Sequence, residues 1–565
     1  MTPVEENAKD TFIPASHVNI NDASLDELGV ETLLDALHPA TVAGREWLRD
    51  RLSNPTTDGT VLRARQDQIR TIRTLLKTSS PSNALLQTNR ALLATTESSI
   101  HTMADAAKDS RHADFYNQLL WAPDSIAAPL NTWGWFTELV VVFRSLILPA
   151  LAVLMPILLF LAPIVSLLVS GDPITAERYW NLLQIALRKA VPSGSGIGIG
   201  SGSGRFTSPF MLMAEQCMSV GASLVMLVAT AWSQVSTGLS IHRVVVDMRS
   251  RATATQQSAN AIQQLVNELR KGGVHLESHK TDWPLSTLAT FGMAWNHPDS
   301  IRIQLNQMGE LDGLLTLALA KRTCFPQFAD ATQITDLWHP GLTRKGGSRV
   351  YNSIDLRSPT HVLLTGPNRG GKTTILTSLG AAVLMSQTVG IVFARRATLP
   401  LFGAIRTSLR PVDTLGKRSL FETEIDIACK VHAIAATSTP THPLFLLMDE
   451  IFHGTNARDG VEAAEVFLDR LYKTVPGSVI SIISTHYAEL PVRYGPSSTS
   501  PSVQTLCMDA HVDPANPDRI ISTYRLRTGV NSLSSVREIL RERGLLGPSE
   551  PKSPIPNPKT PTPTP

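Results

Sequence analysis

The 565-residue chain has few cysteines, few charges and few aromatic residues, and these shortages argue against several classes of protein. Its four cysteines are widely separated and include no C-x-x-C pair. This pattern argues against a disulfide framework or a zinc site and is typical of a reducing compartment. Charged residues make up 18 % of the chain and the net charge is +3. Without a long Lys/Arg run, the sequence has no electrostatic footprint of a nucleic-acid binder.

The two ends of the chain give little information about function. The N-terminal residues, Met-Thr-Pro-Val-Glu-Glu, are acidic rather than apolar, so we expect no secretory or transit peptide. Residues 547–565 are rich in Pro, Ser and Thr and are expected to be disordered. The length suits two or three domains with a sizeable core.

A glycine-rich segment, Gly-Pro-Asn-Arg-Gly-Gly-Lys-Thr-Thr at 366–374, carries the strongest chemical signal. It follows an apolar, strand-like run at 361–365 and opens a helical pattern. In that order the motif predicts a phosphate-binding loop, because glycines let backbone N–H groups face phosphate oxygens at a helix N-terminus. A glycine-rich strand–helix turn without a nucleotide is the alternative. The expected nucleotide-binding residues are Gly366, Pro367, Asn368, Gly370, Gly371, Lys372, Thr373 and Thr374.

Two further apolar runs each end in residues suited to phosphate chemistry. The run at 444–448 ends in Asp449 and Glu450, and the run at 479–483 is followed by Ser484-Thr485-His486. We expect Lys372 to reach the β- and γ-phosphates, and Thr373 and Asp449 to hold Mg²⁺. Glu450 is expected to polarise the attacking water as general base. His486 is expected to contact the γ-phosphate or that water; an ordinary strand-end polar residue is the alternative.

These clusters together predict the fold class and the reaction. Ligands bind at the carboxyl ends of the strands in parallel α/β sheets, and all three clusters follow strand-like runs. We therefore expect an α/β P-loop NTPase with a parallel-sheet core, using ATP as substrate and Mg²⁺ as cofactor. An ABC transporter is disfavoured, because an L-S-G-G-Q segment is absent.

The residue patterns of these motifs resemble those of the MutS-type mismatch-repair ATPases. The loop at 366–374 matches G-P-N-x-G-G-K-[ST]-T, and the acidic run matches L-L-D-E-I-x-x-G-T except at Met448. Residues 485–490 match T-H-Y-x-E-L, and residues 419–424 resemble S-T-F-x-x-E. Upstream, residues 24–125 resemble the start of the helical lever of that family, and Glu-Leu-Asp at 310–312 resembles the helix ahead of its ATPase domain. The resemblance implies an ABC-type ATPase domain preceded by an all-α lever.

The resemblance also implies partners and roles. In that family the serine at the place of Ser419 acts in trans on the partner's γ-phosphate, which implies a homodimer or a MutS-like heterodimer with composite sites. A helix N-cap is the other role open to Ser419, and the two are compatible. Asn352 lies in a segment that resembles the one contacting the base. Mismatched or branched duplex DNA is the implied ligand. Phe452 and His453 stand where the family has Gly-Arg, so subunit communication is expected to differ.

A long uncharged stretch interrupts the lever-like region. From Ser145 to Ser170 there are 26 residues without a charge, more than the roughly 20 needed to cross a bilayer. A second uncharged window runs from Gln216 to Ile241, and a Ser/Gly-rich linker at 193–204 lies between the two. We expect a two-span membrane hairpin in the position of the family's DNA clamp, with the ATPase domain on the cytosolic or nucleoplasmic side of an unidentified membrane. A helical pair buried in protein is the alternative.

Two functions remain open from the sequence. The first is a dimeric, MutS-like ATPase that engages DNA and is membrane-anchored. The second is a membrane-tethered mechanochemical ATPase that acts on a protein or lipid partner without DNA. The expected organisation is a tail (1–23), the first half of the lever (24–136), the hairpin (137–241), the second half of the lever (242–334), the ATPase domain (335–546) and a Pro-rich tail (547–565).

Overall fold

A computed structural model of the chain describes residues 17–77, 81–105, 113–190, 209–276, 281–345, 349–356, 360–409, 419–495 and 503–546. Residues 1–16 of the expected N-terminal tail, the whole expected C-terminal tail (547–565) and the Ser/Gly-rich linker at 193–204 lie outside the described residues. Residues 17–23 are described, and the first helix begins at Asp22, inside the tail expected at 1–23. The chain divides into two compact units. Unit 1 comprises residues 1–87, 267–276 and 309–565, and unit 2 comprises residues 88–266 and 277–308.

A six-stranded sheet forms the centre of unit 1, in the order β10-β9-β4-β8-β7-β6. Adjacent strands from β9 to β6 run parallel, whereas β10 pairs antiparallel with β9, so the sheet is mixed rather than purely parallel. Its inner strands are five- or six-residue apolar runs that are buried along their whole length, as expected for strands covered on both faces. The strands are β4 (His361–Thr365), β6 (Ala404–Ser408), β7 (Leu444–Met448), β8 (Val479–Ser484), β9 (Val503–Asp513) and β10 (Asn516–Thr528).

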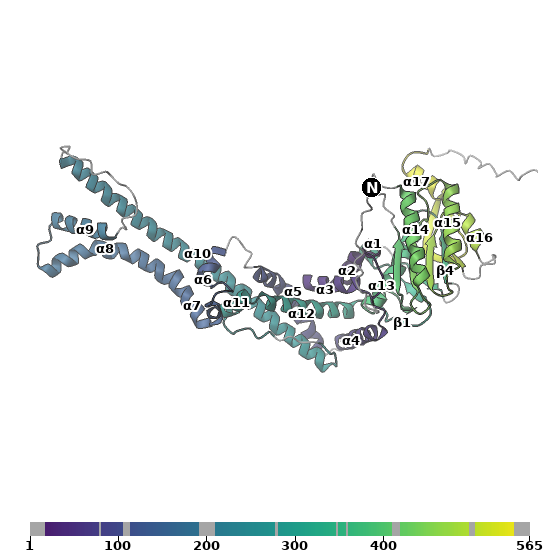
Figure 1. The fold of residues 1–565 in the computed structure, drawn as a ribbon, viewed down its shortest axis with the longest axis horizontal. Helices are drawn as coiled ribbons and strands as arrows, with labels where there is room; N and C mark the ends of the chain where they lie inside the picture. Colours follow the sequence, from purple (N-terminus) through teal and green to yellow (C-terminus); the bar gives the residue numbers. More distant parts are fainter. Residues whose placement is uncertain are drawn as a thin grey trace, which may run out of the picture. The chain divides into compact units, whose positions relative to one another are not determined.

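Helices cover both faces of this sheet (Figure 1). One face packs against α14 (Leu420–Thr437) and α15 (Ala457–Leu471), whose buried residues form one cluster with Leu446 and Met448 of β7. The opposite face meets α13 (Lys372–Thr388), where a Cβ added at Gly380 would lie 2.9 Å from Leu447 Cδ1. Side chains alternate along a strand, so Leu447 points away from Leu446 and Met448. The short helices α16 (Glu489–Tyr494) and α17 (Val536–Glu542) complete the domain.

A second, four-stranded sheet, in the order β1-β5-β2-β3, also belongs to unit 1. It contains β1 (Gln327–Phe328), β2 (Gln333–Leu337), β3 (Asn352–Asp355) and β5 (Arg396–Leu399), with a 3-10 turn at Pro340–Lys345. Only β1 and β5 pair in parallel. The side chain of Asn352 on β3 hydrogen-bonds to the backbone of β10 and so joins this sheet to the six-stranded one.

The remaining helices of unit 1 pack against each other through small residues. A Cβ added at Gly313 would lie 2.3 Å from the Trp47 ring, so glycine is required for the close contact between the end of α12 and α3. Thr41, the N-cap of α3, hydrogen-bonds to the buried carboxylate of Asp312. The helices are α1 (Asp22–Glu27), α2 (Val30–Leu37), α3 (Val42–Ser53), α4 (Gly59–Lys77) and the C-terminal part of α12 (Pro298–Leu319).

Unit 2 is entirely helical among its described residues. Its aromatic core joins Tyr116 to Phe291 and Trp295, with ring centroids 5.6 and 5.8 Å apart, while Asn131 hydrogen-bonds to Trp121 and Asn296. Its elements are most of α5 (Pro81–Ala104), α6 (Ala113–Leu119), a 3-10 helix (Ala128–Thr132), α7 (Gly134–Val142), a π-turn (Phe143–Ile147), α8 (Leu148–Ser170), α9 (Ala176–Ala190), most of α10 (Pro209–Lys271), α11 (Thr287–Asn296) and the first half of α12.

The uncharged stretch forms a continuous helix from α7 through the π-turn into α8. Pro149 lacks the N–H that would bond to the Ser145 carbonyl, and a π-turn at this point accommodates the missing bond. Helix α10 approaches there at Gly238, where an added Cβ would lie 2.8 Å from the Ser145 oxygen. Helix α9 folds back onto α8, and the Tyr179 hydroxyl donates to the Phe160 carbonyl at 3.2 Å.

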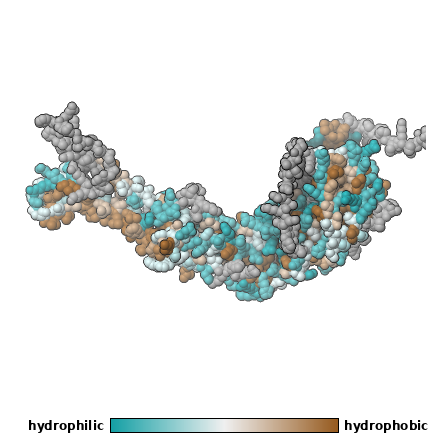
Figure 2. All heavy atoms as spheres, viewed as in Figure 1, coloured by the Kyte–Doolittle hydropathy of each residue, from teal (hydrophilic) through white to brown (hydrophobic). Residues whose placement is uncertain are grey.

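Two helices of unit 2 are long and apolar enough to cross a membrane by length and composition, Gly134–Ser170 and Leu224–Lys271. Only 11 % of the most apolar window of each is buried. Figure 2 shows hydrophobic atoms along the surface of α7 and α8. Length and exposure of two helices are weak evidence for a membrane span, so the hairpin expected from the sequence stays a prediction.

Candidate active site

The glycine-rich segment links β4 to α13 with strand, loop and helix in the expected order. Gly366 has φ of 145° and Gly371 has φ of 97°, which glycine adopts without strain. A Cβ at Gly366 would also lie 2.9 Å from the Met508 Cβ on β9. Gly370 N–H donates to the Pro367 carbonyl at 3.0 Å, which curls the loop. The glycines therefore allow the tight curl of this loop between β4 and α13.

Lys372 begins α13 and is almost fully buried, with 5 % of its side chain exposed. Its ammonium donates to the carbonyls of Gly366 and Pro367, at 3.1 and 3.4 Å, and lies beneath the loop. Burial lowers the pKa of Lys372, and the carboxylates of Glu450 and Asp449 oppose that shift. A buried ammonium inside a curled backbone loop is suited to bind an anion such as a phosphate group.

Asp449 connects the ends of three elements. Its carboxylate accepts hydrogen bonds from the Thr373 hydroxyl at the start of α13 and from the Ser484 hydroxyl at the end of β8. Ser484 also accepts a hydrogen bond from the Glu450 N–H at 2.9 Å. Mg²⁺ prefers oxygen ligands from one or two side chains together with phosphates and water, so the hydroxyl and carboxylate of this pair fit the ion.

The carboxylate of Glu450 lies close to the ammonium of Lys372. Its Oε1 is 2.7 Å from the Nε2 of His486 and 3.9 Å from the Lys372 ammonium. The hydrogen bond with His486 lowers the pKa of Glu450, burial opposes it, and the charge of Lys372 adds to the lowering. The backbone of Glu450 has φ of 54°, an uncommon conformation that clusters at functional sites.

The Nε2 of His486 also lies 3.2 Å from the Lys372 ammonium. This nitrogen either donates a hydrogen to Glu450 or accepts one from Lys372, but it cannot do both at once. The geometry thus places Lys372, Thr373, Asp449, Glu450 and His486 in one hydrogen-bonded group, although they come from three strand ends.

Ser419 and Asn352 occupy other surroundings. Ser419 is the exposed N-cap of α14 and forms a capping box with Glu422, the role that we had kept open beside the trans role. The amide of Asn352 donates to the Tyr524 carbonyl at 3.1 Å and accepts from the Leu526 N–H at 2.8 Å. Asn352 therefore ties β3 to β10, and it also lines the cavity beside the loop.

A cavity of about 400 Å³ opens next to the phosphate loop. Gly371 and Thr374 of the motif line it, together with residues that the sequence patterns had not singled out as a site. The Arg349 guanidinium lies over the Trp338 ring, 4.9 Å from its centroid. The planar guanidinium of Arg349, the indole of Trp338 and the phenol of Tyr524 can each stack on a flat heterocycle or lie at its edge. The additional lining residues include Trp338, Arg349, Met508 and Tyr524.

The C-terminal helix α17 stabilises the outer side of the loop. Arg369 forms an ion pair with Glu542 at 2.6 Å, and the Ser535 hydroxyl donates to the Asn368 carbonyl at 2.9 Å. Neither contact was foreseen, because residues about 170 positions apart carry no joint sequence signal.

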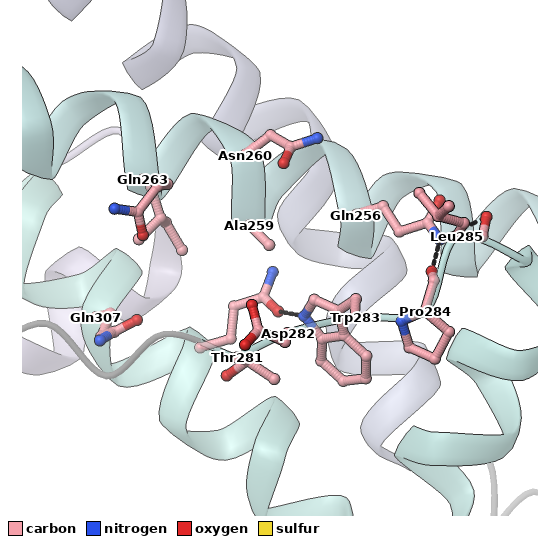
Figure 3. Close-up of a pocket in the computed structure, with 12 residues that line it drawn as sticks. Gln256, Ala259, Asn260, Gln263, Thr281, Asp282, Trp283, Pro284, Leu285 and Gln307 are labelled. Carbon is pink, nitrogen blue, oxygen red and sulfur yellow. Dashed lines mark hydrogen bonds between the residues drawn. The ribbon is translucent and has the colours of Figure 1, made fainter. Parts of the chain in front are cut away.

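Another cavity, of about 340 Å³, lies in unit 2 between α10, α12 and residues 281–285 (Figure 3). Amide side chains predominate in its lining, and Trp283 donates to the buried Gln304 at 2.9 Å. None of its lining residues is Lys, Arg or His, and Asp282 is the one charged residue among them. Because triphosphates need cationic groups or convergent N–H donors, this cavity is poorly suited to a nucleoside triphosphate.

Comparison with known proteins agrees with this geometry. Residues 362–541 match the family model MutS domain V. The chain is 40 % identical over 148 residues to the DNA mismatch repair protein MutS of Shouchella clausii, covering 26 % of this chain and 16 % of the relative. It is 32 % identical over 195 residues to that of Lactobacillus helveticus (33 % and 22 %), and 32 % identical over 196 residues to that of Thermus aquaticus (34 % and 23 %).

The chain spans about a fifth of the length of the curated relatives that it matches. The matched region contains the phosphate loop, Asp449, Glu450 and His486. The resemblance to MutS-type mismatch-repair proteins that the motifs predicted is confirmed for this region, residues 362–541.

Proposed function

We propose that the chain is a Mg²⁺-dependent ATPase of the MutS type. One observation carries the proposal: a buried lysine beneath a curled glycine loop lies 3.9 Å from a carboxylate that a histidine holds at 2.7 Å. Thr373 and Asp449 supply oxygen ligands beside them. This set has the parts required for phosphoryl transfer to water, which are a phosphate cradle, a metal site and a base.

Each side chain has a distinct role in this reaction. Lys372 and the loop N–H groups hold the phosphates, and Thr373 and Asp449 hold Mg²⁺, which neutralises charge on the phosphate oxygens. Glu450 accepts a hydrogen bond from the attacking water and orients it. When ATP draws the Lys372 ammonium toward its phosphates, His486 is free to donate to Glu450 or to the γ-phosphate. The cavity lined by Trp338 and Tyr524 receives the base.

The working form in this proposal is a homodimer or a MutS-like heterodimer that engages mismatched or branched duplex DNA. The support is the confirmed resemblance, together with relatives that are named DNA mismatch repair proteins. Ser419 supports a composite site, because it is exposed at the head of α14 and can reach a second subunit.

Membrane attachment is the second part of the proposal. Its support is α8, a 23-residue apolar helix whose Leu154 and Leu158 are 45 and 48 % exposed. An exposed apolar surface of this length is unusual in a soluble monomer. The bilayer hydrocarbon would cover that surface, with α10 as the returning helix. The alternative function, a membrane-tethered ATPase acting on a protein or lipid partner without DNA, shares the support of α8 but lacks that of the DNA mismatch repair relatives.

Turnover measurements on the purified full chain in detergent test the enzymatic part. ATP hydrolysis is measured without DNA and with plain, mismatched and branched duplexes at a stated salt concentration. Hydrolysis that DNA stimulates supports the MutS-like function. Hydrolysis indifferent to every DNA supports the alternative, and no hydrolysis with Mg²⁺ present contradicts both.

Vesicle flotation tests the membrane part. Leu154→Lys with Leu158→Lys is expected to abolish co-flotation, because each charge costs about 2.5–3.5 kcal/mol at the centre of a bilayer. Leu285→Lys is the matched control, since Leu285 is fully exposed in unit 2 but lies outside the apolar helices. Equal flotation of the double variant and the control would contradict membrane insertion of α8.

A further inference from the structure

A short turn, residues 450–454, connects the catalytic strand β7 to the helix α15. Glu450 and Phe452 in this turn both have positive φ, 54° and 53°, which is costly for residues other than glycine. Such a backbone persists only when its surroundings hold it in place. The contacts that hold this turn therefore also determine where the Glu450 carboxylate lies.

The first contact is a buried carboxylate on α14. Glu424, whose side chain is 6 % exposed, accepts a hydrogen bond from the Gly454 N–H at 3.2 Å and lies 2.9 Å from the His453 Nδ1. The same Nδ1 lies 2.9 Å from the Glu450 carbonyl. Both groups facing Nδ1 are acceptors, so this nitrogen carries the hydrogen. The single Nδ1 hydrogen is shared between the Glu424 carboxylate and the Glu450 carbonyl, so His453 bridges these two groups.

The second contact is close packing between the turn and the first turn of α14. A Cβ added at Gly454 would lie 2.8 Å from the Phe421 nitrogen and 3.1 Å from the Glu424 carboxylate. The rings of Phe421 and Phe452 meet edge to face with centroids 6.3 Å apart. Because no space separates the two segments, a movement at the head of α14 must displace the turn as well.

The third contact joins the turn to the strand end that carries His486. The Tyr487 hydroxyl donates to the Phe452 carbonyl at 2.6 Å. The turn is therefore held between α14 on one side and the His486–Tyr487 segment on the other. Ser419, five residues before Glu424, is the exposed cap of the same α14.

We propose that His453 and Glu424 form a link that transmits the position of Ser419 to Glu450. His453 is a positioning residue, since it contacts the backbone of Glu450 and not the reacting atoms. When Ser419 of one subunit engages the γ-phosphate held by its partner, α14 shifts, and the link re-aims Glu450 in its own subunit. This inference rests on the proposed ATPase function and on the trans role of Ser419.

Steady-state ATPase kinetics of the full chain, with analogue affinity measured separately, test the link. His453→Ala is expected to lower kcat roughly tenfold while the affinity for a fluorescent ATP analogue stays unchanged, because small misplacements of a catalytic group slow chemistry strongly. His453→Asn retains an N–H donor near the position of Nδ1 and is expected to recover most of kcat. His442→Ala, an exposed histidine between α14 and β7, is the control.

A double-mutant cycle tests transmission from Ser419. If the link carries the effect of Ser419, Ser419→Ala with His453→Ala lowers kcat no further than the more severe single variant. If the effects of the two substitutions on kcat multiply instead, the link is contradicted. It is also contradicted if His453→Asn turns over ATP as slowly as His453→Ala. If the wild type hydrolyses ATP and the His453 variants are as active as the wild type, only the link is contradicted. If the wild type does not hydrolyse ATP, both the proposed function and the link are contradicted.

Discussion

The carboxylate of Asp312 accepts hydrogen bonds from both the backbone N–H and the hydroxyl of Thr41, at 2.8 and 2.9 Å, across 271 residues of sequence. Both residues are buried in unit 1. The pair joins α3, which precedes the residues of unit 2 in the chain, to the C-terminal part of α12, which follows them. The N-terminal helices and the segment leading into the two sheets of unit 1 are thereby held together as one folded unit.

Replacing Asp312 by Ala is expected to lower the free energy of unfolding by about 2–3 kcal/mol, because the buried N–H of Thr41 loses its acceptor. Thermal or denaturant unfolding of unit 1 measures the effect. Gly44→Ala provides an independent variant, since its Cβ would lie 2.2 Å from the same carboxylate oxygen. Asp299→Ala, with an exposed carboxylate on the same α12, is the control and is expected to change little.

Lys372→Ala is expected to weaken ATP binding about 100-fold or more, because the cradle loses its buried positive charge where the phosphates bind. Equilibrium binding of a fluorescent ATP analogue measures the loss. Lys430→Ala, an exposed lysine on α14, is the matched control. Unchanged affinity in Lys372→Ala would remove the glycine-rich loop from the nucleotide site.

Glu450→Gln is expected to bind ATP normally and to lower turnover about 10²–10⁴-fold, since an amide cannot accept the proton of the attacking water. Single-turnover hydrolysis and analogue binding, measured on the same preparation, separate the two effects. Glu462→Gln, an exposed glutamate on α15, is the control. Normal turnover by Glu450→Gln would show that Glu450 is not the base.

The rate of ATP hydrolysis is expected to depend on pH through two groups, a carboxyl group that must be ionised and an amine that must be protonated. Glu450 must be ionised, and its pKa lies below the usual 4.5, so we expect no loss of kcat as pH falls from 8 to 6 on its account. Lys372 must be protonated, and burial lowers its pKa below 10.5, so KM for ATP is expected to rise on the alkaline side before that pH is reached. A KM that stays constant up to pH 10.5 would contradict the second expectation.

His361 is expected to make the domain around the six-stranded sheet sensitive to acid. It is buried at the start of β4, hydrogen-bonded to Ser481, and burial lowers its pKa from 6.5 to about 4. The unfolded chain therefore binds a proton more readily, so stability is complete above pH 6.5 and falls by up to about 3 kcal/mol as pH drops toward 4. The melting temperature against pH measures this loss. His361→Gln is expected to flatten the curve between these pH values.

The inner strands and the strand–loop–helix order around the glycine-rich segment were well predicted from sequence. The expected runs at 361–365, 444–448 and 479–483 coincide with β4, β7 and most of β8. Strands covered on both faces are continuous apolar runs, which is a strong local signal. The antiparallel β10 was not foreseen, because pairing between neighbouring strands depends on tertiary contacts and not on local composition. The sheet is consequently mixed where a parallel one was expected.

The helices between residues 134 and 271 were predicted less completely from the sequence. The sequence interpretation divided residues 209–271 at the change from uncharged to charged composition, but α10 continues through that change without a break. Helix continuity depends on the backbone, and the chain contains no proline inside α10 and stops the helix only at Gly272-Gly273. Helix α9 was missed because its amphipathic pattern lies between two stronger apolar windows.

By itself the sequence predicted which residues would carry phosphate chemistry, because glycine spacing, a following lysine and carboxylates at strand ends are local patterns tied to local geometry. It also revealed the resemblance to MutS-type proteins, since those motifs are specific. Only the tertiary structure decided that Ser484 joins Asp449 to Glu450, that Trp338 and Tyr524 line one cavity, and that Glu424 holds His453. These relationships arise from contacts between segments far apart in the chain, which depend on how whole elements pack.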